Sequence, residues 1–318
     1  MKIIIQIPCY NEEKTLPGVI EDLPKQILGV DHVEYLVIND GSTDKTLDVA
    51  RKLGVHHILD LGTNHGLATT FLRGIAKCLE LGANIIVNTD GDNQYRADCI
   101  KDLVKPIVEG RLDIVVGARP IRDIEHFSWM KKILQQLGSR VVRQFSDTNI
   151  PDATSGFRAY SAEAAMRLHV FNRYTYTLET IIQAGRMNMR IGHVPVQVNP
   201  KKRESRLISS ITNYLWRSAA IIVRSYITYK PLRTFCYLSL IPAVFGLAIC
   251  FRFLYYYLTG NGAGHIQSII LAAILLLISF YLLVLGILAD LLAVNRRLLE
   301  DMQFRIKKIE IKENGRSS

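Results

Sequence analysis

The sequence predicts an α/β domain with a mostly parallel sheet, followed by two helices that span a membrane. Two observations lead to this prediction. Short runs rich in valine and isoleucine alternate with helical patterns in the first part of the chain, and two long apolar runs follow near its end. Such alternation is typical of a parallel sheet covered by helices, and ligands are expected beyond the carboxyl ends of its strands.

Each element of the domain is predicted from a local pattern. Short apolar runs predict strands at residues 2–8, 33–40, 56–61, 83–90 and 112–118. Apolar residues at helical spacing, several of them followed by glycine, predict helices within residues 13–27, 42–54, 66–82 and 97–110. The first strand leads into PCYNEE and not into a glycine-rich phosphate loop, which argues against an ATPase or a dehydrogenase.

Two segments near the end of the chain are long enough to cross a bilayer as helices. Residues 234–258 and 266–290 are almost continuously apolar, and about 20 helical residues cover the ~30 Å hydrocarbon core. A buried hairpin in a soluble core is the alternative, but the run SIILAAILLLISFYLLVLGILA has no polar face. Lysine and arginine flank the runs and are absent from the connection TGNGAGH, so the domain and both termini are predicted to be cytoplasmic.

The net charge of +10 comes with a cluster of basic residues just before the first apolar run. Contact with anionic headgroups explains this placement better than nucleic acid does, so no nucleic-acid partner is expected. Apolar residues at near-helical spacing favour an amphipathic interfacial helix there, and an ordinary solvated charge run is the alternative. We therefore expect four parts: an α/β domain at 1–200, a basic amphipathic juxtamembrane segment at 201–233, a two-helix transmembrane hairpin at 234–294 and a basic cytoplasmic tail at 295–318.

The five cysteines of the chain show no metal-ligand spacing and are odd in number. Free thiols are therefore expected, as is usual in the cytoplasm. Cys9 lies within a motif, but it is not expected to be a catalytic nucleophile.

The segment NTDGDNQY places two carboxylates, Asp90 and Asp92, two residues apart after a predicted strand. Two carboxylates on one exposed turn supply hard oxygen ligands, and Gln94 can add a carbonyl oxygen or a hydrogen bond. This set suits Mg²⁺ or Mn²⁺ that holds a nucleotide diphosphate. The same residues also make a good turn, which is the alternative interpretation.

Five motifs in this order, with the paired apolar runs after them, resemble family 2 of the inverting glycosyltransferases: IPCYNEEKTL, VINDGSTDKT, NHGLATT, NTDGDNQY and DATSGFRAYS. The chain is similar in particular to the branch of polyprenyl-phosphate glycosyltransferases that includes dolichyl-phosphate mannose synthase. The resemblance covers residues 1 to about 230 by motif and the rest by topology. It implies the Rossmann-like GT-A fold and transfer of a sugar from a nucleotide sugar to a polyprenyl phosphate, dolichyl or undecaprenyl.

The resemblance also implies roles for single residues. The donor pocket would be lined by residues of the first, second and fourth motifs: Pro8, Tyr10, Glu12, Asp40 and Asp90. The metal would be held by Asp90, Asp92 and Gln94. The chain departs from the family's pattern at Asn39, where aspartate is common, and at Tyr95–Arg96, where a proline pair often follows.

Basic residues are implied near the phosphates and near the acceptor. Arg119 and Arg158 match family positions at the diphosphate, where a guanidinium can make paired hydrogen bonds to phosphate oxygens. With Asp92 they are the residues implied in catalysis, although either arginine could instead form an ordinary ion pair. The acceptor site is expected at Ser155, Lys202, Arg203, Ser205 and Arg206, where the segment RESRL matches the family only in part.

The implied reaction is one in-line displacement that inverts the configuration at the anomeric carbon. A lipid phosphate is already an anion and needs no strong general base. Glu179 is the one carboxylate comparable to the acceptor-side base of processive polymerases, and it could be an ordinary helix residue.

Two alternatives to this function stay open. One is a glycosyltransferase that uses a glycan or lipid hydroxyl, as in polysaccharide or glycolipid synthesis, and the other is a non-catalytic membrane scaffold. The expected partners are a nucleotide-sugar donor, a polyprenyl-phosphate acceptor and a membrane. Two spans per chain also hint at a homo-oligomer.

Overall fold

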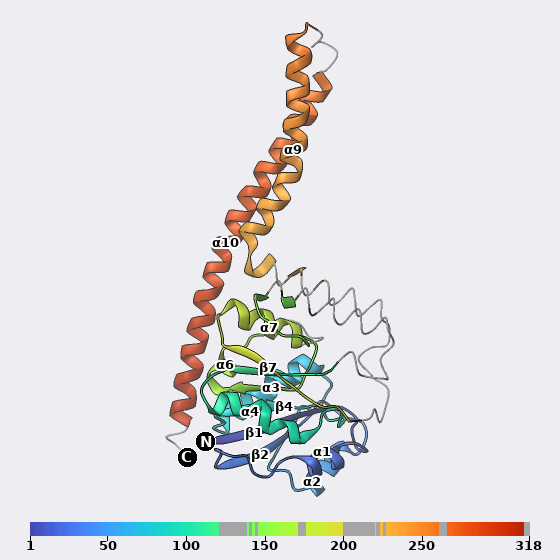
Figure 1. Cartoon of the computed structure of the whole chain (residues 1–318), viewed down its shortest axis with the longest axis vertical. Helices are drawn as coiled ribbons and strands as arrows, with labels where there is room; N and C mark the ends of the chain where they lie inside the picture. Colours follow the sequence, from blue (N-terminus) through green and yellow to red (C-terminus); the bar gives the residue numbers. More distant parts are fainter. Residues whose placement is uncertain are drawn as a thin grey trace. The chain divides into compact units, whose positions relative to one another are not determined.

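The computed structural model describes residues 1–120, 146–170, 176–199, 227–260 and 266–314, together with positions 139, 142, 143, 220, 223 and 224. The chain forms two compact units (Figure 1). The first consists of Met1–Ile222 and Gln303–Ser318, and the second of Val223–Met302. In sequence, the second unit is therefore an insertion between two parts of the first.

Seven strands form one sheet in the described part of the first unit, in the order β3-β2-β1-β4-β6-β5-β7. Their bounds are β1 Lys2–Cys9, β2 His32–Asn39, β3 His57–Asp60, β4 Ile85–Asn88, β5 Ile114–Ala118, β6 Arg158–Ser161 and β7 Ile191–Pro195. Neighbouring strands are parallel, except that β6 runs antiparallel to both β4 and β5. The predicted mostly parallel sheet is confirmed, and the five predicted strands correspond to β1 to β5.

Helices cover both faces of this sheet. Their bounds are α1 Leu16–Asp22, α2 Thr46–Lys52, α3 Leu67–Glu80, α4 Ile100–Val108, α6 Ala162–Arg167 and α7 Thr177–Arg186, with a 3₁₀ turn, η1, at Ala97–Cys99. The four helices predicted from periodicity correspond to α1, α2, α3 and α4.

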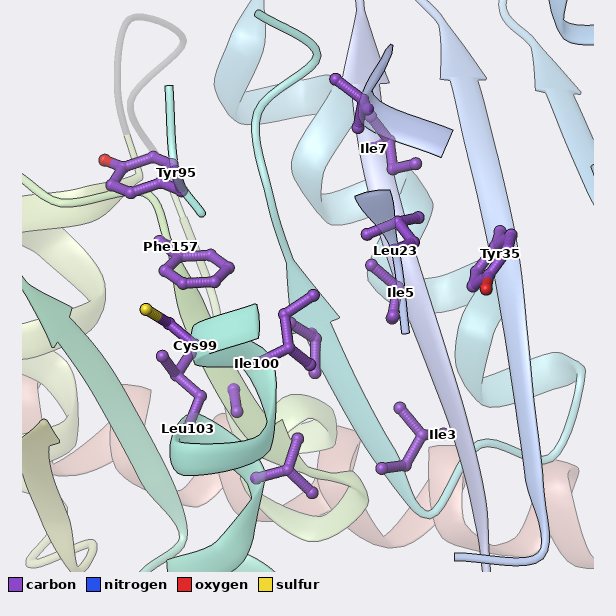
Figure 2. Packing of buried hydrophobic residues seen from close by; sticks show 14 of the residues in the cluster. Ile3, Ile5, Ile7, Leu23, Tyr35, Tyr95, Cys99, Ile100, Leu103 and Phe157 are labelled. Carbon is purple, nitrogen blue, oxygen red and sulfur yellow. The ribbon is translucent and has the colours of Figure 1, made fainter. Parts of the chain in front are cut away.

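The central strand β1 is buried on both faces, which explains its nearly continuous apolar sequence, KIIIQIP. Ile3, Ile5 and Ile7 pack in one core with residues of α1 and α4. Ile4 packs on the other face with residues of α3, α6 and α7. Figure 2 shows the core that contains Ile3, Ile5 and Ile7, and Ile100 of α4 belongs to the same core.

The end of α10 belongs to the first unit. This helix runs from Ile266 to Asn314, and its end, from position 303, is part of the α/β unit. Phe304 is 7% exposed and joins the core that contains α3 and α6. The guanidinium carbon of Arg167 in α6 lies 3.9 Å from the centroid of the Phe304 ring. The helix thus continues through the segment that was expected to be a basic tail.

The second unit is a pair of apolar helices, α9 at Pro231–Leu258 and α10 up to Met302. Most of their large apolar side chains are exposed. Both helices are long and apolar enough to cross a membrane, in agreement with the two predicted spans. The predicted amphipathic segment at 201–233 lies largely outside the described residues.

Small residues bring α9 and α10 close together. A Cβ on Gly246 of α9 would lie 3.1 Å from Cγ of Leu276 in α10. Between the helices, the hydroxyl of Ser279 donates a hydrogen bond of 2.9 Å to the carbonyl oxygen of Ser239. Close backbone approach and an interhelical hydrogen bond are typical of helix pairs that pack within lipid.

Candidate active site

The carboxyl ends of β1, β2 and β4 lie side by side at one edge of the sheet. Cys9 pairs with Asn39, and Gln6 pairs with Asn88, in the two parallel ladders of β1. The loops that follow these strands therefore meet at this edge, where parallel sheets bind ligands. The structure brings together there the predicted residues Pro8, Tyr10, Glu12, Asp40, Asp90, Asp92 and Gln94.

Glu12 supports the loop that carries the two aspartates of the D-x-D segment. It is 7% exposed, and its Oε2 lies 2.7 Å from the hydroxyl of Thr15. The same hydroxyl lies 2.8 Å from the carbonyl oxygen of Gly91, the middle residue of that segment. A Cβ on Gly91 would lie 3.0 Å from Sγ of Cys9. Glycine at this position therefore lets the first motif and the D-x-D loop pack closely.

Asp40 fixes the loop that leads into α3. Its two carboxylate oxygens accept the backbone N–H groups of His65 at 2.8 Å and Gly66 at 3.0 Å. The next residue, Gly41, has a φ of +66°, and a Cβ there would lie 2.4 Å from the carbonyl carbon of Thr63. The turn therefore requires glycine at position 41. The hydrogen bonds of Asp40 give it a role in loop structure, and its place in the donor pocket stays a prediction.

The asparagine at position 39 has a structural reason. Asn39 is 3% exposed, and its Nδ2 donates to Oδ1 of Asp60 on the neighbouring strand at 2.8 Å. Its Oδ1 accepts the backbone N–H of Ser42 at 3.2 Å. A carboxylate at this position would face the carboxylate of Asp60, and like charges directly opposite each other destabilise a strand pair. The carboxylate of Asp60 therefore explains why position 39 carries asparagine and not the family's usual aspartate.

The predicted metal site offers oxygen ligands, which a hard divalent cation prefers: the carboxylates of Asp90 and Asp92 and the amide oxygen of Gln94. The two aspartates are half-buried, and Oδ1 of Asp92 accepts the backbone N–H of Gln94 at 3.1 Å. Every atom with which these three side chains can coordinate a metal is an oxygen. Such a set fits Mg²⁺ or Mn²⁺ when substrate phosphates complete the coordination. Among the residues that the structure describes, no group of three or more His, Cys, Asp or Glu side chains could hold a metal. The candidate set is therefore two carboxylates and one amide.

Gly156 lies directly against the Asp90 carboxylate. A Cβ on Gly156 would lie 3.2 and 3.4 Å from the two carboxylate oxygens of Asp90, and 3.0 Å from the hydroxyl of Tyr176. The carbonyl oxygen of Gly156 accepts hydrogen bonds from Nδ2 of Asn88 at 2.9 Å and from the Tyr176 hydroxyl at 3.2 Å. Its N–H donates to the hydroxyl of Tyr95 at 3.3 Å. Only glycine fits this position without a shift of its neighbours.

Three buried polar residues near Gly156 are not among the site residues predicted from the sequence: Gln6, Asn88 and Tyr176. Nε2 of Gln6 donates to Oδ1 of Asn88 at 2.9 Å, and Nδ2 of Asn88 donates to the Tyr176 hydroxyl at 2.8 Å. All three residues are fully buried. The available signal was one amide in each of two otherwise apolar strands, KIIIQIP and IIVN, because a buried polar group needs a partner.

The two tyrosines next to Gly156 keep their phenolic protons at neutral pH. Burial raises the pKa of Tyr95 to about 12 against the opposing charge of Arg119, and the negative charge of Asp90 adds to the increase. Burial, with a further contribution from Asp90, raises the pKa of Tyr176 well above its ordinary value. Two neutral hydroxyl groups therefore lie near the Asp90 carboxylate.

Arg119 and Asp152 form a buried ion pair. Nε of Arg119 lies 2.7 Å from Oδ2 of Asp152 and Nη2 lies 3.1 Å from Oδ1, with side chains 7% and 1% exposed. Burial opposes the charged form of Asp152, but Arg119 outweighs this effect and holds the pKa of that carboxyl below its ordinary value. The structure thus shows Arg119 as an ion-pair partner, and its contact with phosphate stays a prediction.

Arg158 fastens the loop at 152–157 from within the core. It is fully buried in β6, and its guanidinium donates to the carbonyl oxygens of Ser155 at 2.8 Å and Ala153 at 2.9 Å. A third hydrogen bond of 2.7 Å goes to the hydroxyl of Thr180 in α7. Ser155 is also fully buried. The predicted roles of Arg158 at the phosphates and of Ser155 at the acceptor stay predictions.

The other predicted acceptor residues are not among the described residues: Lys202, Arg203, Ser205 and Arg206. Glu179, which was considered as a base, lies in α7 and is 9% exposed. Its role stays a prediction.

The cysteines are free, as predicted. Cys9 is buried beside the first motif, and its thiol donates to the carbonyl oxygen of Ile7. Burial, with a further contribution from Glu12, raises the pKa of the Cys9 thiol far above its ordinary value. Such a thiol is a poor nucleophile, so Cys9 has a packing role.

Comparison with protein families matches residues 4–168, more than half of the chain, to the family described as Glycosyl transferase family 2. One similar protein is the UDP-N-acetylglucosamine--dolichyl-phosphate N-acetylglucosaminyltransferase of Methanococcus voltae, 28% identical over 217 residues that cover 61% of this chain and 84% of that protein. Another is the Undecaprenyl-phosphate mannosyltransferase of Micrococcus luteus, 26% identical over 222 residues that cover 66% of this chain and 89% of that protein.

Solved structures of glucosyl-3-phosphoglycerate synthase from Mycobacterium tuberculosis are similar in fold. The complex with Mn²⁺, UDP and glucosyl-3-phosphoglycerate has a TM-score of 0.56 at 18% identity and covers 72% of this chain and 79% of that chain. The complex with UDP has a TM-score of 0.58 at 19% identity and covers 71% of this chain and 80% of that chain. At these identities the likeness shows the fold alone, and the predicted GT-A fold is confirmed.

Proposed function

Because the chain belongs to glycosyl transferase family 2 and is a glycosyltransferase, we propose that it moves a sugar from a nucleotide-sugar donor to a polyprenyl phosphate at a membrane. The D-x-D loop carries this proposal. It lies where β1, β2 and β4 end, and it is fastened to the first motif through the hydroxyl of Thr15. An oxygen-rich turn at this edge of a parallel sheet suits a nucleotide diphosphate and its cation.

Two observations support a polyprenyl phosphate as the acceptor: the names of two similar proteins and the apolar helices of the second unit. The two similar transferases are named for dolichyl phosphate and undecaprenyl phosphate. α9 and α10 are long and apolar enough to span the bilayer in which a polyprenyl chain resides. In the proposal, the first unit and both termini are cytoplasmic, and the lipid phosphate is met by Lys202, Arg203, Ser205 and Arg206. Ser155 is buried, so it acts through the loop at 152–157 and not by direct contact.

The donor side is assigned to the loops at the sheet edge. Pro8, Tyr10, Glu12, Asp40 and Asp90 would line the nucleotide-sugar pocket. Asp90, Asp92 and Gln94 would hold Mg²⁺ or Mn²⁺, which supplies positive charge to the diphosphate when bound. The presence of Mn²⁺ and UDP together in the similar synthase supports this assignment.

The proposed chemistry is a displacement with inversion. An oxygen of the lipid phosphate attacks the anomeric carbon as the nucleoside diphosphate leaves from the opposite face. This oxygen is already anionic, so no side chain has to remove a proton. The contacts of Arg119 and Arg158 favour support of the loop at 152–157 over direct binding of phosphate.

The variant Asp92→Asn tests the proposal. An amide offers the cation one weaker oxygen and no charge, so transfer should fall by about a hundredfold or more, which corresponds to a few kcal/mol of lost charge stabilisation. Membranes that contain the protein are incubated with a panel of radiolabelled sugar nucleotides, polyprenyl phosphate and Mn²⁺. The label in the organic phase is then measured.

Asp98→Asn is the matched control, because Asp98 is 52% exposed and pairs with Arg96 on the surface. This variant should transfer sugar at the wild-type rate. Full activity of Asp92→Asn would refute the assignment of the D-x-D loop. Label that accumulates in a lipid-free glycan instead of the organic phase would identify the hydroxyl-acceptor alternative.

A further inference from the structure

The Asp90 carboxylate lies beside the backbone of Gly156, where a side-chain carbon would be crowded. An ideal Cβ on Gly156 would meet Oδ1 of Asp90 at 3.2 Å and the Tyr176 hydroxyl at 3.0 Å. The carboxylate and the phenol therefore share the space beside the α-carbon of Gly156. A displacement of Gly156 would change where the carboxylate can lie.

Two side chains hold Gly156 through its carbonyl oxygen. Asn88 donates to this oxygen at 2.9 Å from β4, and Tyr176 donates at 3.2 Å from the residue before α7. The Asn88 amide also donates to the Tyr176 hydroxyl at 2.8 Å, which closes a triangle of hydrogen bonds. Because Asn88, Tyr176 and Gly156 are all buried, water does not compete for these bonds.

The two donors are themselves held in place. The ring of Tyr176 stacks on Phe71 with centroids 3.8 Å apart and planes inclined by 1°. Gln6 donates to the Asn88 side chain at 2.9 Å, and a Cβ on Gly74 of α3 would lie 2.4 Å from Oε1 of Gln6. Packing therefore restricts both the phenol and the amide, so they can define the position of the group that they bind.

A third contact fixes the other side of Gly156. Its N–H donates to the Tyr95 hydroxyl at 3.3 Å, and the Tyr95 ring stacks on Phe157 with centroids 4.9 Å apart. Figure 2 shows the Tyr95 ring above the Phe157 ring. Gly156 is thus held through both of its backbone polar groups, and the face of its α-carbon is turned to Asp90.

We propose that Tyr176 and Asn88 are positioning residues for the divalent cation: they fix Gly156, and Gly156 fixes the Asp90 carboxylate in the orientation that binds the metal. The inference rests on the proposed function, since it takes Asp90 as a ligand. Residues that orient a metal ligand commonly change affinity by about 10- to 100-fold when they are substituted.

Tyr176→Phe tests this role with little change in packing, because the ring and its stack on Phe71 are retained. The probe is Mn²⁺ alone, bound to the full-length protein in detergent, with free Mn²⁺ measured by electron paramagnetic resonance. We expect the dissociation constant to rise about tenfold. Gly156→Ala should raise it further, because the added methyl group enters the space of the carboxylate.

Tyr160→Phe is the matched control. Tyr160 is equally buried and lies against the same ring, with its centroid 5.8 Å from that of Phe71. Its hydroxyl forms no hydrogen bond of good geometry in the described part of the chain, and its polar neighbours are Arg158 and Thr180. Loss of this hydroxyl should leave Mn²⁺ affinity unchanged, even if stability changes.

Metal rescue separates positioning from a purely structural effect. At low Mn²⁺, Tyr176→Phe should show a reduced transfer rate, and a tenfold excess of Mn²⁺ should restore the wild-type rate. Wild-type Mn²⁺ affinity in both Tyr176→Phe and Gly156→Ala, or a rate that Mn²⁺ does not restore, would overturn the inference and leave the proposed function intact. Absence of Mn²⁺ binding by the wild type would overturn the inference, and absence of sugar transfer by the wild type would overturn the proposed function as well.

Discussion

Asp152 illustrates how strongly a single buried charge depends on its partner. Its carboxylate is the counter-charge of Arg119, and neither side chain has more than 7% of its surface exposed. We expect Asp152→Asn to lower the free energy of unfolding at pH 7 by about 3–5 kcal/mol, because the buried guanidinium then lacks its counter-charge. Urea denaturation followed by circular dichroism measures this difference.

The effect should depend on pH in a defined direction. The folded-state pKa of Asp152 is depressed, so its contribution is complete above the ordinary value of about 3.9 and is lost as the pH falls through the lower folded-state value. The difference between wild type and variant should therefore shrink below about pH 4. Glu109→Gln is the control, because its pair with Arg111 is 40% and 63% exposed and should contribute less than about 1 kcal/mol. An equally small loss for Asp152→Asn would contradict the argument.

At the same scale, the sequence predicts which residues stand at the sheet edge but not how they are held there. Asp90 and Asp92 follow an apolar strand, so their place could be predicted from local pattern alone. The partnership of Gly156 with Asn88 joins residues 68 positions apart, and no local signal encodes it. Burial of Arg158 depends in turn on the position of β6 within the sheet.

Among the elements, the predicted strands are short apolar runs, and most of them contain consecutive valine or isoleucine residues. β6 was not predicted because it has four residues, RAYS, and begins with a charged side chain. β7, IGHVP, contains a glycine, a histidine and a proline and is only partly buried. Both are strands because tertiary pairing with β5 and β4 outweighs their weak local preference.

The end of α10 is an element whose role in the first unit can be tested. Phe304 is 7% exposed in the core with α3 and α6, and its ring lies against Arg167. Phe304→Ala should lower the free energy of unfolding of the first unit by about 3 kcal/mol, because it leaves a cavity and removes the ring. Thermal denaturation monitored by circular dichroism would show this loss.

Ile306→Ala serves as the control for this helix end, because Ile306 is 51% exposed. Its loss should stay within about 0.5 kcal/mol. If Phe304→Ala and Ile306→Ala lowered the free energy of unfolding equally, the end of α10 would stabilise the first unit through its helix propensity and not through core packing.

For the whole molecule, the discontinuous first unit suggests a way to obtain it without the apolar helices. A chain in which a long Gly/Ser linker replaces residues 223–302 retains both parts of the first unit. It should be soluble without detergent and more stable than residues 1–222 alone by about 3 kcal/mol, the contribution expected from Phe304. Comparison of the two chains by urea denaturation provides the measurement, and equal stability would show that the end of α10 is dispensable.

The discontinuity of the first unit also orders the events of biosynthesis. A ribosome releases residues 1–222 first, then both apolar helices, and only afterwards Phe304. During translation, a domain begins to fold from its N-terminal part, but a core residue that is encoded last can pack only at the end. A nascent α/β unit therefore lacks part of its core until the hairpin has been made. By the time its folding can finish, the segment proposed to tether it to the membrane has already left the ribosome.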